Sequence, residues 1–479
     1  MILLEQIFGK ADSKFSGVKG AVAEMVGVDI HSTPGLIKVH QKLTKESGAT
    51  VTELCKVRIA ASNGYSFWFS ADSGKIWART SVGVWSLAYT TSPAAGEAKC
   101  LGAAEFNGYI YWATQSRLHR IAIADADDAW ASVSLDWATF SVCDSSFHPM
   151  QVQNNILFIG DGNLVASVNA SGTFADGSSK QANTLDIKTP HRIKTIIDFD
   201  IDLLLGTHIA DTVNNCQVVR WDTESDSWIT SDPIEENGIN AFIRDDNYVY
   251  VQAGQFGKIY LYNGEQLVPF KRIPGDWSPT KTAVIHPQAV STLLTIPVFG
   301  LSNVAGNPCY QGVYSFGSYS KDYPKILDLS YPVSTEDLTG VEVGAVLAIG
   351  ADLLVAWKVG ASCGVDKLDW TAKYASAFIE TMMVHFGGVR QILKTLMRVF
   401  ANYASLPTNT NIKFKYKKKH EASFNDYMTT IDDTDLMQIR SEDSIPDVAN
   451  LQLRIEFVVS GNNGPEVESL GYLDSISEQ

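Results

Sequence analysis

The sequence lacks both the long apolar stretch of a membrane protein and the clustered cysteines of a disulfide-rich protein. Nothing in its 479 residues approaches the ~20 consecutive apolar residues that a membrane-spanning helix requires. Its six cysteines lie far apart and include no Cys-x-x-Cys pair, which favours reduced thiols packed as small hydrophobic side chains. Residues 1–6 have no basic region, so we expect no signal peptide and synthesis in a reducing cytoplasm.

Charge is also scarce, and the usual catalytic motifs are missing. Charged residues make up 19% of the chain and the net charge is −15, which argues against a general nucleic-acid coat but leaves contact through a local basic patch open. The nine histidines form no His-x-His or His-x-x-x-His pair, and there is no Gly-x-Ser-x-Gly elbow, phosphate-binding loop or dinucleotide fingerprint. We therefore expect no enzyme activity, no cofactor and no metal.

What the sequence does contain is a repeated unit of about 45 residues, the length of a four-stranded propeller blade. Each copy has a polar turn, an aromatic or β-branched run, a second turn and a second apolar run, which is the pattern of a hairpin. The first runs lie at 65–69, 109–112, 156–159, 203–205 and 248–251, with weaker copies at 293–296 and 352–357. The repeat predicts an all-β protein with a β-propeller of about seven blades over residues 51–368.

The two ends of the chain have different patterns. In residues 369–479, the runs 412–416 and 451–457 alternate between apolar and polar side chains, which predicts a C-terminal β-sandwich. The run 392–403 also fits a helix, but its setting among strands and the stop at Leu406-Pro407 favour a strand. Residues 1–50 fit neither part, and we expect either an extended N-terminal arm ordered by a neighbouring subunit or a loosely packed terminus.

One motif marks the fold more sharply. Ser70, Asp72, Gly74 and Trp77 match the pattern Ser-x-Asp-x-Gly-x-x-Trp and resemble the Asp box of sialidases and other propellers. We expect the Asp carboxylate to bond backbone amides, Gly to take a positive φ, and Trp to pack beneath the turn. The box has a structural role. A sialidase would also need an arginine cluster, a nucleophilic tyrosine and an acid pair.

Two charged clusters are candidate binding sites. Asp198, Asp200 and Asp202 are spaced to lie on one face of a strand, where they either hold Ca²⁺ or form a solvated edge or turn, and the Gly-containing calcium loop is missing. Lys415, Lys417, Lys418 and Lys419 form the one basic cluster. They either dock against a negatively charged partner, DNA included, or form a solvated hairpin end.

Both ends of the chain resemble one class of protein. Residues 27–39 (Gly-Val-Asp-Ile-His-Ser-Thr-Pro-Gly-Leu-Ile-Lys-Val), followed by Gln41-Lys-Leu43, resemble the opening of a group of bacteriophage virion structural proteins that enter a propeller at this point. The C-terminal stretches resemble the β-sandwich that ends such proteins: Ile379-Glu380, Arg398, Leu406-Pro407, Ile412, 453–456 and 469–471.

The resemblance implies a homo-oligomeric tail nozzle, hub or adaptor ring in the virion, made in the host cytoplasm. Its implied partners are copies of itself and other virion proteins, close to packaged DNA, and no catalytic residue carries over. Two alternatives stay open. One is a propeller module that binds a host surface glycan or protein, and the other is a glycan-active enzyme of sialidase-like fold.

Overall fold

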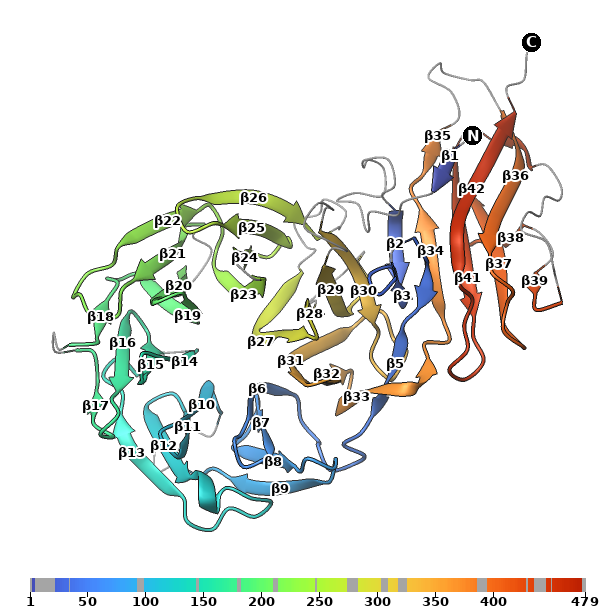
Figure 1. The fold of residues 1–479 in the computed structure, drawn as a ribbon. Helices are drawn as coiled ribbons and strands as arrows, with labels where there is room; N and C mark the ends of the chain where they lie inside the picture. The colour runs from blue at the N-terminus through green and yellow to red at the C-terminus, as the bar shows by residue number, and fades with distance from the viewer. Residues whose placement is uncertain are drawn as a thin grey trace.

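The computed structural model describes the chain apart from residues 1, 5–21, 34, 93–98, 144–145, 179–181, 210–213, 246–247, 274–282, 303–308, 318–324, 386–393, 428–429, 435–444, 449 and 476–479. Within the described residues the only helical element is one 3₁₀ turn, η1 (Ile123–Asp125). All other named elements are strands, so the all-β prediction is confirmed. Figure 1 shows the strands as a ring of sheets with a second group of strands beside it.

Five blades follow one another along the chain as antiparallel meanders. Blade 1 contains β6 (Cys55–Ala60), β7 (Ser66–Ser70), β8 (Lys75–Arg79) and β9 (Trp85–Thr90). Blade 2 contains β10 (Gly102–Phe106), β11 (Tyr109–Ala113), β12 (Arg117–Ala122) and β13 (Ser134–Thr139). Blade 3 contains β14 (Met150–Gln153), β15 (Ile156–Asp161), β16 (Leu164–Val168), β17 (Phe174–Ala175) and β18 (Leu185–Asp186). Blade 4 contains β19 (His191–Phe199), β20 (Asp202–Ile209), β21 (Cys216–Trp221) and β22 (Thr230–Ile234). Blade 5 contains β23 (Ile239–Asp245), β24 (Tyr248–Ala253), β25 (Lys258–Tyr262) and β26 (Leu267–Arg272).

A sixth blade closes the ring with a strand from the other end of the chain. This closing blade contains β31 (Val341–Ile349), β32 (Asp352–Val359), β33 (Ser362–Lys373) and β5 (Gln41–Lys45). Strand β5 pairs antiparallel with β33, with Leu43 opposite Leu368 and Lys45 opposite Asp366. Backbone hydrogen bonds therefore hold the start of the propeller to its end.

The remaining repeat of the ring belongs to a larger sheet. Strands β27 (Val284–Leu293), β28 (Ile296–Ser302), β29 (Gly312–Gly317) and β30 (Ile326–Tyr331) form a meander, and β27 lies between β23 and β31. The meander is part of an eleven-stranded sheet that continues through β2 (Val22–Val26) into C-terminal strands. The propeller is thus confirmed, but the prediction of about seven separate blades is corrected to six.

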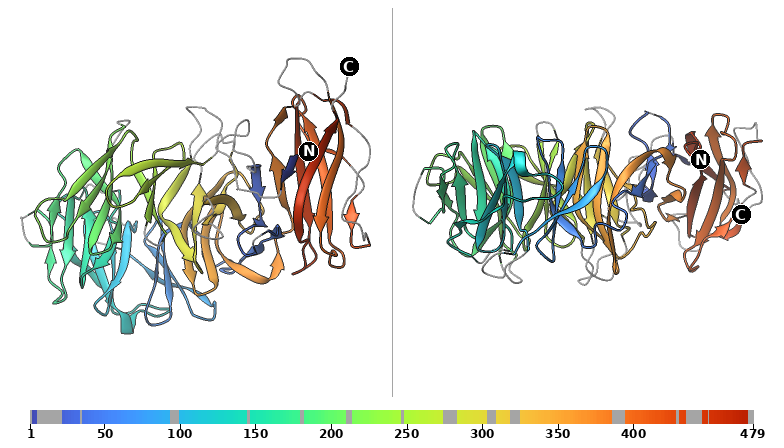
Figure 2. Two further views of the ribbon diagram at one scale, coloured as in Figure 1. Left: turned by 45° about the horizontal axis from the view of Figure 1, so that its top comes forward. Right: turned by 90° about the horizontal axis from the view of Figure 1, so that it is seen from below.

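The C-terminal strands form two sheets, shown side by side in Figure 2. The eleven-stranded sheet continues with β34 (Ala377–Thr381), β41 (Asn450–Val458), β37 (Asn411–Lys418) and β38 (Asn425–Asp426), while β35 (Val384–His385) and β39 (Ile431–Asp432) pair at its margin. The other sheet contains β1 (Ile2–Leu4), β42 (Val467–Ser475), β36 (Lys394–Tyr403) and β40 (Ile445–Val448). We call β34–β42, together with β1 and β2, the C-terminal unit.

One prediction about the ends of the chain is not confirmed, and another is corrected. A self-contained C-terminal sandwich is not confirmed, because the sheet with β34 and β41 is continuous with the propeller through β2. Residues 22–45 are not an extended arm, because β2, β5 and the β3–β4 pair (Val28–Asp29 and Lys38–Val39) are all hydrogen-bonded within the chain. The strand prediction for 392–403 is confirmed as β36. The division at residues 51 and 369 stays a prediction.

Turn chemistry and side-chain packing explain why the repeats fold this way. Asn107 and Gly108 both have positive φ, 47° and 78°, in the two-residue turn between β10 and β11, the geometry that suits a tight hairpin. Aromatic side chains fill the space between neighbouring blades. Trp130 packs 5.0 Å from Phe67 of blade 1 and 5.4 Å from Trp112 of blade 2, measured between ring centroids. Stacking the sheets therefore buries the faces that each would expose alone.

Candidate functional site

A cavity of about 1290 Å³ is lined mainly by the inner strands of the propeller, β6, β10, β14, β19, β23 and β27. We call it the central cavity. Each blade begins with its inner strand, so these strands run in the same direction around the ring. Residues near the start of each strand therefore lie at one end of the cavity. Lys56, Lys194 and His286 occupy such positions, and Lys99 precedes β10.

One ion pair and one hydrogen bond meet at Glu342, at the start of β31. The Lys56 ammonium lies 2.7 Å from a Glu342 carboxylate oxygen, and Nε2 of His286 lies 3.1 Å from the same oxygen. The hydrogen bond from His286, helped by the charge of Lys56, lowers the pKa of Glu342 to about 2. Burial lowers the pKa of His286, so the imidazole is neutral and donates its Nε2 proton to Glu342 at neutral pH.

Lys194 has the most perturbed ammonium group of the cavity. Its Nζ donates a hydrogen bond of 2.6 Å to Oδ1 of Asn240 and lies 5.1 Å from the centre of the Phe147 ring. Burial lowers the pKa of Lys194 to about 8. Neither neighbour carries a negative charge, so these two contacts stabilise the ammonium through the amide dipole and the aromatic face.

Arg58 has a structural role in the wall of the cavity. Its Nε donates to the carbonyl of Val346 at 2.9 Å, and one terminal nitrogen donates to the carbonyl of Val290 at 3.0 Å. The Arg58 backbone N–H donates to Gln288 at 2.9 Å. Burial lowers its pKa to about 10, which leaves the guanidinium charged at neutral pH. Arg58 thus ties β6 to β27 and β31.

The four Asp-box residues lie together, but not in the roles the motif predicts. Oγ of Ser70 accepts the backbone N–H groups of Asp72 and Ser73, each at 3.0 Å, so Ser70 rather than Asp72 organises the turn. Asp72 is exposed and lines the central cavity. Trp77 is buried as expected, with 1% of its surface exposed.

Gly74 corrects a second detail of the motif, because it is not among the glycines with positive φ. Its role is close approach: a Cβ at this position would overlap the backbone carbonyl of Thr91, whose N–H donates to the Gly74 carbonyl at 2.7 Å. Glycine is required here for space rather than for a left-handed conformation.

The three predicted calcium ligands do not share one face of a strand. Asp198 is the last residue but one of β19, Asp200 lies in the turn with φ 55°, and Asp202 begins β20. Asp198 pairs with Arg244, and Asp202 accepts a 2.6 Å hydrogen bond from Nε of Arg220. Both arginines already neutralise these carboxylates. Among the described residues, no group of three or more His, Cys, Asp or Glu side chains is arranged to hold a metal ion.

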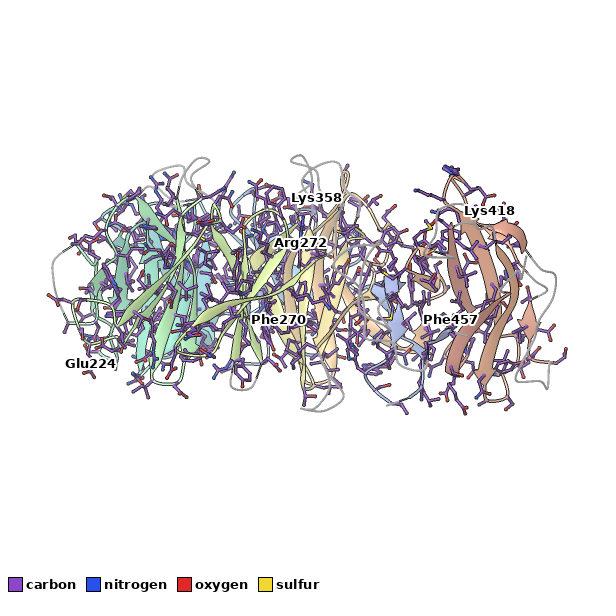
Figure 3. All side chains as sticks on the ribbon, turned by 90° about the horizontal axis from the view of Figure 1, so that it is seen from above. Glu224, Phe270, Arg272, Lys358, Lys418 and Phe457 are labelled. Carbon is purple, nitrogen blue, oxygen red and sulfur yellow. The ribbon has the colours of Figure 1, made fainter. Side chains whose placement is uncertain are left out.

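The lysine cluster lies in the last residues of β37, with Lys419 in the turn that follows. Lys415 pairs with Glu456 on the neighbouring strand at 3.1 Å, and the Lys417 ammonium lies 4.7 Å from the centre of the Phe424 ring. Lys419 is exposed in the turn. Figure 3 shows Lys418 at one edge of the C-terminal unit, on the same side of the molecule as Lys358 of the propeller. Whether this cluster binds a partner stays a prediction.

The structure also reveals a buried polar cluster around His31, within the segment that resembles phage proteins. Nε2 of His31 lies 2.9 Å from Oδ1 of Asp328, which also accepts the Ser315 hydroxyl at 2.9 Å. The Asp29 carboxylate accepts the backbone N–H groups of His31 and Ser32 at 2.9 Å each. Burial opposes protonation of His31, but the hydrogen bond and charge of Asp328 outweigh it and raise the pKa.

This cluster does not have the geometry of a nucleophile–histidine–carboxylate relay. Ser315 and Asp328 both approach the same ring nitrogen of His31, whereas a relay needs them on opposite nitrogens. All three side chains are buried. The cluster therefore anchors residues 29–32 against β29 and β30.

Sequence reasoning missed the central cavity because its residues come from different blades. Lys56, Lys99 and Lys194 are separated by more than forty residues from one another and belong to no local motif. The available signal was their recurrence in three repeats, just before or within the first strand of blades 1, 2 and 4.

Comparisons with known proteins show no family for this chain. No family model matches the chain, and no curated protein matches it. Among solved structures, the extracellular domain of a putative hybrid two component system from B. thetaiotaomicron is 13% identical, with a TM-score of 0.47 over 76% of this chain, which spans 44% of that one. Virginiamycin B lyase from Staphylococcus aureus is 13% identical, with a TM-score of 0.45, over 68% of this chain and 98% of that one.

Similarity at this level carries no information on activity, ligand or partners. Nothing in these comparisons links the chain to a phage virion protein. In the part of the chain that the structure describes, no helix has the length and hydropathy needed to cross a membrane.

Proposed function

We propose that the chain is a non-catalytic, ring-forming structural protein of a bacteriophage particle, a tail nozzle, hub or adaptor component. The observation that supports this role is that the two parts of the chain that resemble phage proteins are hydrogen-bonded to each other. The backbone N–H of Ile37 donates to the carbonyl of Val467 at 2.8 Å, and the Val467 N–H donates back to Ile37 at 3.0 Å. Strand β2 pairs with β34 from Val22 to Val26.

These pairings make the segments one structural element. Strand β2, which directly precedes residues 27–39, lies between β30 and β34, with Val26 opposite Leu329 on one side and Phe378 on the other. A continuous hydrogen-bonded sheet transmits force better than a flexible linker, which suits a subunit held in a symmetric assembly.

The C-terminal unit also offers strand edges for a neighbouring subunit. In the four-stranded sheet, β1 and β40 are the outer strands, and each has one side without a partner strand among the described residues. Such edges are templates for pairing with another chain. Localisation in the virion, with copies of the same chain and other virion proteins as partners, belongs to this proposal.

Native mass spectrometry of the purified full chain tests the proposal. We expect one closed species whose mass is a fixed multiple of the 52.4 kDa subunit. A monomer at every concentration up to the solubility limit would contradict a ring-forming role. Turnover of a fluorogenic glycoside, lost on substitution of an acidic residue of the central cavity, would contradict the non-catalytic part and favour the enzyme alternative.

A further inference from the structure

The charge of the central cavity is opposite in sign to that of the whole protein. The chain has 38 Lys and Arg residues against 53 Asp and Glu residues. The cavity lining has five, Lys56, Arg58, Lys99, Lys194 and Arg244, against the two carboxylates of Asp72 and Glu105. Two further carboxylates, Glu342 and Asp198, pair with Lys56 and Arg244 from outside the lining, so the positive charges still outnumber the negative ones by five to four. A cavity with walls of low dielectric constant concentrates the field of the charges that line it. Its local potential therefore favours anions although the protein is acidic.

We propose that the end of the central cavity formed by Lys56, Lys99 and Lys194 binds a small anionic ligand through its phosphate or carboxylate oxygens. The three lysines come from blades 1, 2 and 4, so the ring brings them to one end of the cavity. The cavity volume of about 1290 Å³ is large enough for a small organic molecule. This inference does not depend on the assembly role proposed above.

Lys194 is the central group of the site. An ammonium has three N–H donors, and one of them bonds Asn240. Among the described residues no acceptor is found for the other two, and no carboxylate neutralises the charge. A bound oxyanion would supply both an acceptor and a countercharge. Binding an anion would therefore raise the lowered pKa of Lys194.

The other two lysines differ in how far they are already neutralised. Lys56 shares its charge with Glu342. Lys99 is exposed at the mouth, with no ion pair or side-chain hydrogen bond to any described residue. We expect Lys194 to contribute most to affinity, because it is the most desolvated, and Lys99 to contribute less, because water screens it.

The affinity should depend on pH through Lys194. Cys216 of β21 and His286 of β27 are titratable groups that interact with Lys194, and Glu236, paired with Lys258, faces Cys216. Burial raises the pKa of Cys216 to about 12 and lowers that of His286, so both stay neutral from pH 7 to pH 9. Above pH 8 the amino group of Lys194 in the free protein is mostly neutral. Lys194 must then take up a proton when the anion binds, so the affinity for the anion falls as the pH rises.

Isothermal titration calorimetry of the full chain tests the site, with inorganic pyrophosphate and glucuronate as probes and glucose as the neutral control. We expect pyrophosphate, glucuronate or both to bind, and glucose not to bind. The probe that binds identifies phosphate or carboxylate as the preferred group. Binding of glucose as tight as that of the anions, or no binding of either anion, would overturn the proposal.

Substitutions locate the binding. Lys194→Met should weaken the affinity for the anion by about tenfold or more, and the affinity of this variant should no longer fall between pH 7 and pH 9. The control is Lys358→Met, at a lysine of β32 outside the cavity lining, whose affinity should stay within about twofold of the wild-type value. Lys99→Ala should weaken the affinity for the anion by about threefold. Because Lys99 is exposed, this variant should fold, and it tests the site if the Lys194 variant does not fold. Equal affinities in all variants would place the anion elsewhere and refute the site.

Discussion

The buried carboxylate of Asp366 gives the sharpest prediction about the closing blade. Asp366 lies on β33 opposite Lys45 of β5, and 0% of its surface is exposed. Oδ1 of Asp366 accepts the Trp357 indole N–H at 2.5 Å and the Ser334 hydroxyl at 2.7 Å, and Oδ2 accepts the Ser334 backbone N–H at 2.7 Å. Burial raises the pKa of Asp366 from 3.8 to about 6, because these hydrogen bonds only partly replace water.

The direction of the pH effect follows from this raised pKa. The folded state holds the proton more tightly than the unfolded chain, so Asp366 favours folding most below pH 4, and this contribution is lost as the pH rises through 6. One pKa unit corresponds to about 1.4 kcal/mol, so the difference between pH 4.5 and pH 7.5 is about 2 kcal/mol. Asp366→Asn keeps the shape and the acceptor oxygen but removes the titration.

Urea unfolding of the wild type and the Asn variant at both pH values tests this. The free energy of unfolding of the wild type, relative to the variant, should fall by about 2 kcal/mol between pH 4.5 and pH 7.5. Asp352→Asn in the same blade is the matched control, since this half-exposed carboxylate pairs with Lys367 at 2.8 Å and should change the difference by less than about 0.5 kcal/mol. A constant difference between wild type and Asp366→Asn would refute the reasoning.

Two further predictions concern the joined ends of the chain. Gly27→Ala should lower the free energy of unfolding by about 2–4 kcal/mol, because Gly27 has φ 65° and an added Cβ would overlap the Tyr374 ring. Gly350 has a similar φ of 60°, but an added Cβ there would meet only open space. Gly350→Ala should therefore lower the free energy of unfolding by only about 1 kcal/mol. Thermal unfolding of both variants measures this, and equal losses would contradict the packing argument. If the lysine cluster docks on a neighbouring subunit, Lys419→Glu should lower the association constant of the oligomer by about tenfold at low salt. Lys358→Glu, in the propeller, should leave the association constant unchanged. Light scattering measures both, and no difference between the two variants would mean that the cluster is a solvated hairpin end.

Local chemistry made much of the fold predictable. The polar turn at Asn107-Gly108 and the run from Tyr109 to Trp112 predict a strand, and the structure has β11 there, with positive φ at both turn residues. Such features depend on residues a few positions apart, so sequence reveals them. The pairing of β5 with β33 joins residues more than 300 positions apart, and no local pattern in Gln41–Lys45 specifies that partner.

The candidate sites were less predictable for a related reason. Asp202 and Asp198 look like metal ligands in sequence, but their neutralising partners Arg220 and Arg244 come from another strand and another blade. The predicted positive φ of Gly74 was wrong. Glycine is needed at this position because the backbone carbonyl of Thr91, on the next hairpin, leaves no room for a Cβ. The role of a polar residue in this fold depends on the neighbouring strands, and the repeat alone does not identify them.

Hydrogen exchange at the closing strand tests the central structural claim most directly, that the N-terminal segment completes the propeller. In β5 and β33, the residues Leu43 and Leu368 are paired and both are buried. The amides of Gln41–Lys45 that bond β33 should therefore exchange as slowly as the β33 amides that bond β5, because these hydrogen bonds break together when β5 separates from β33. Rapid exchange across Gln41–Lys45, while the β33 amides that bond β32 stay protected, would show that the ring closes without this segment.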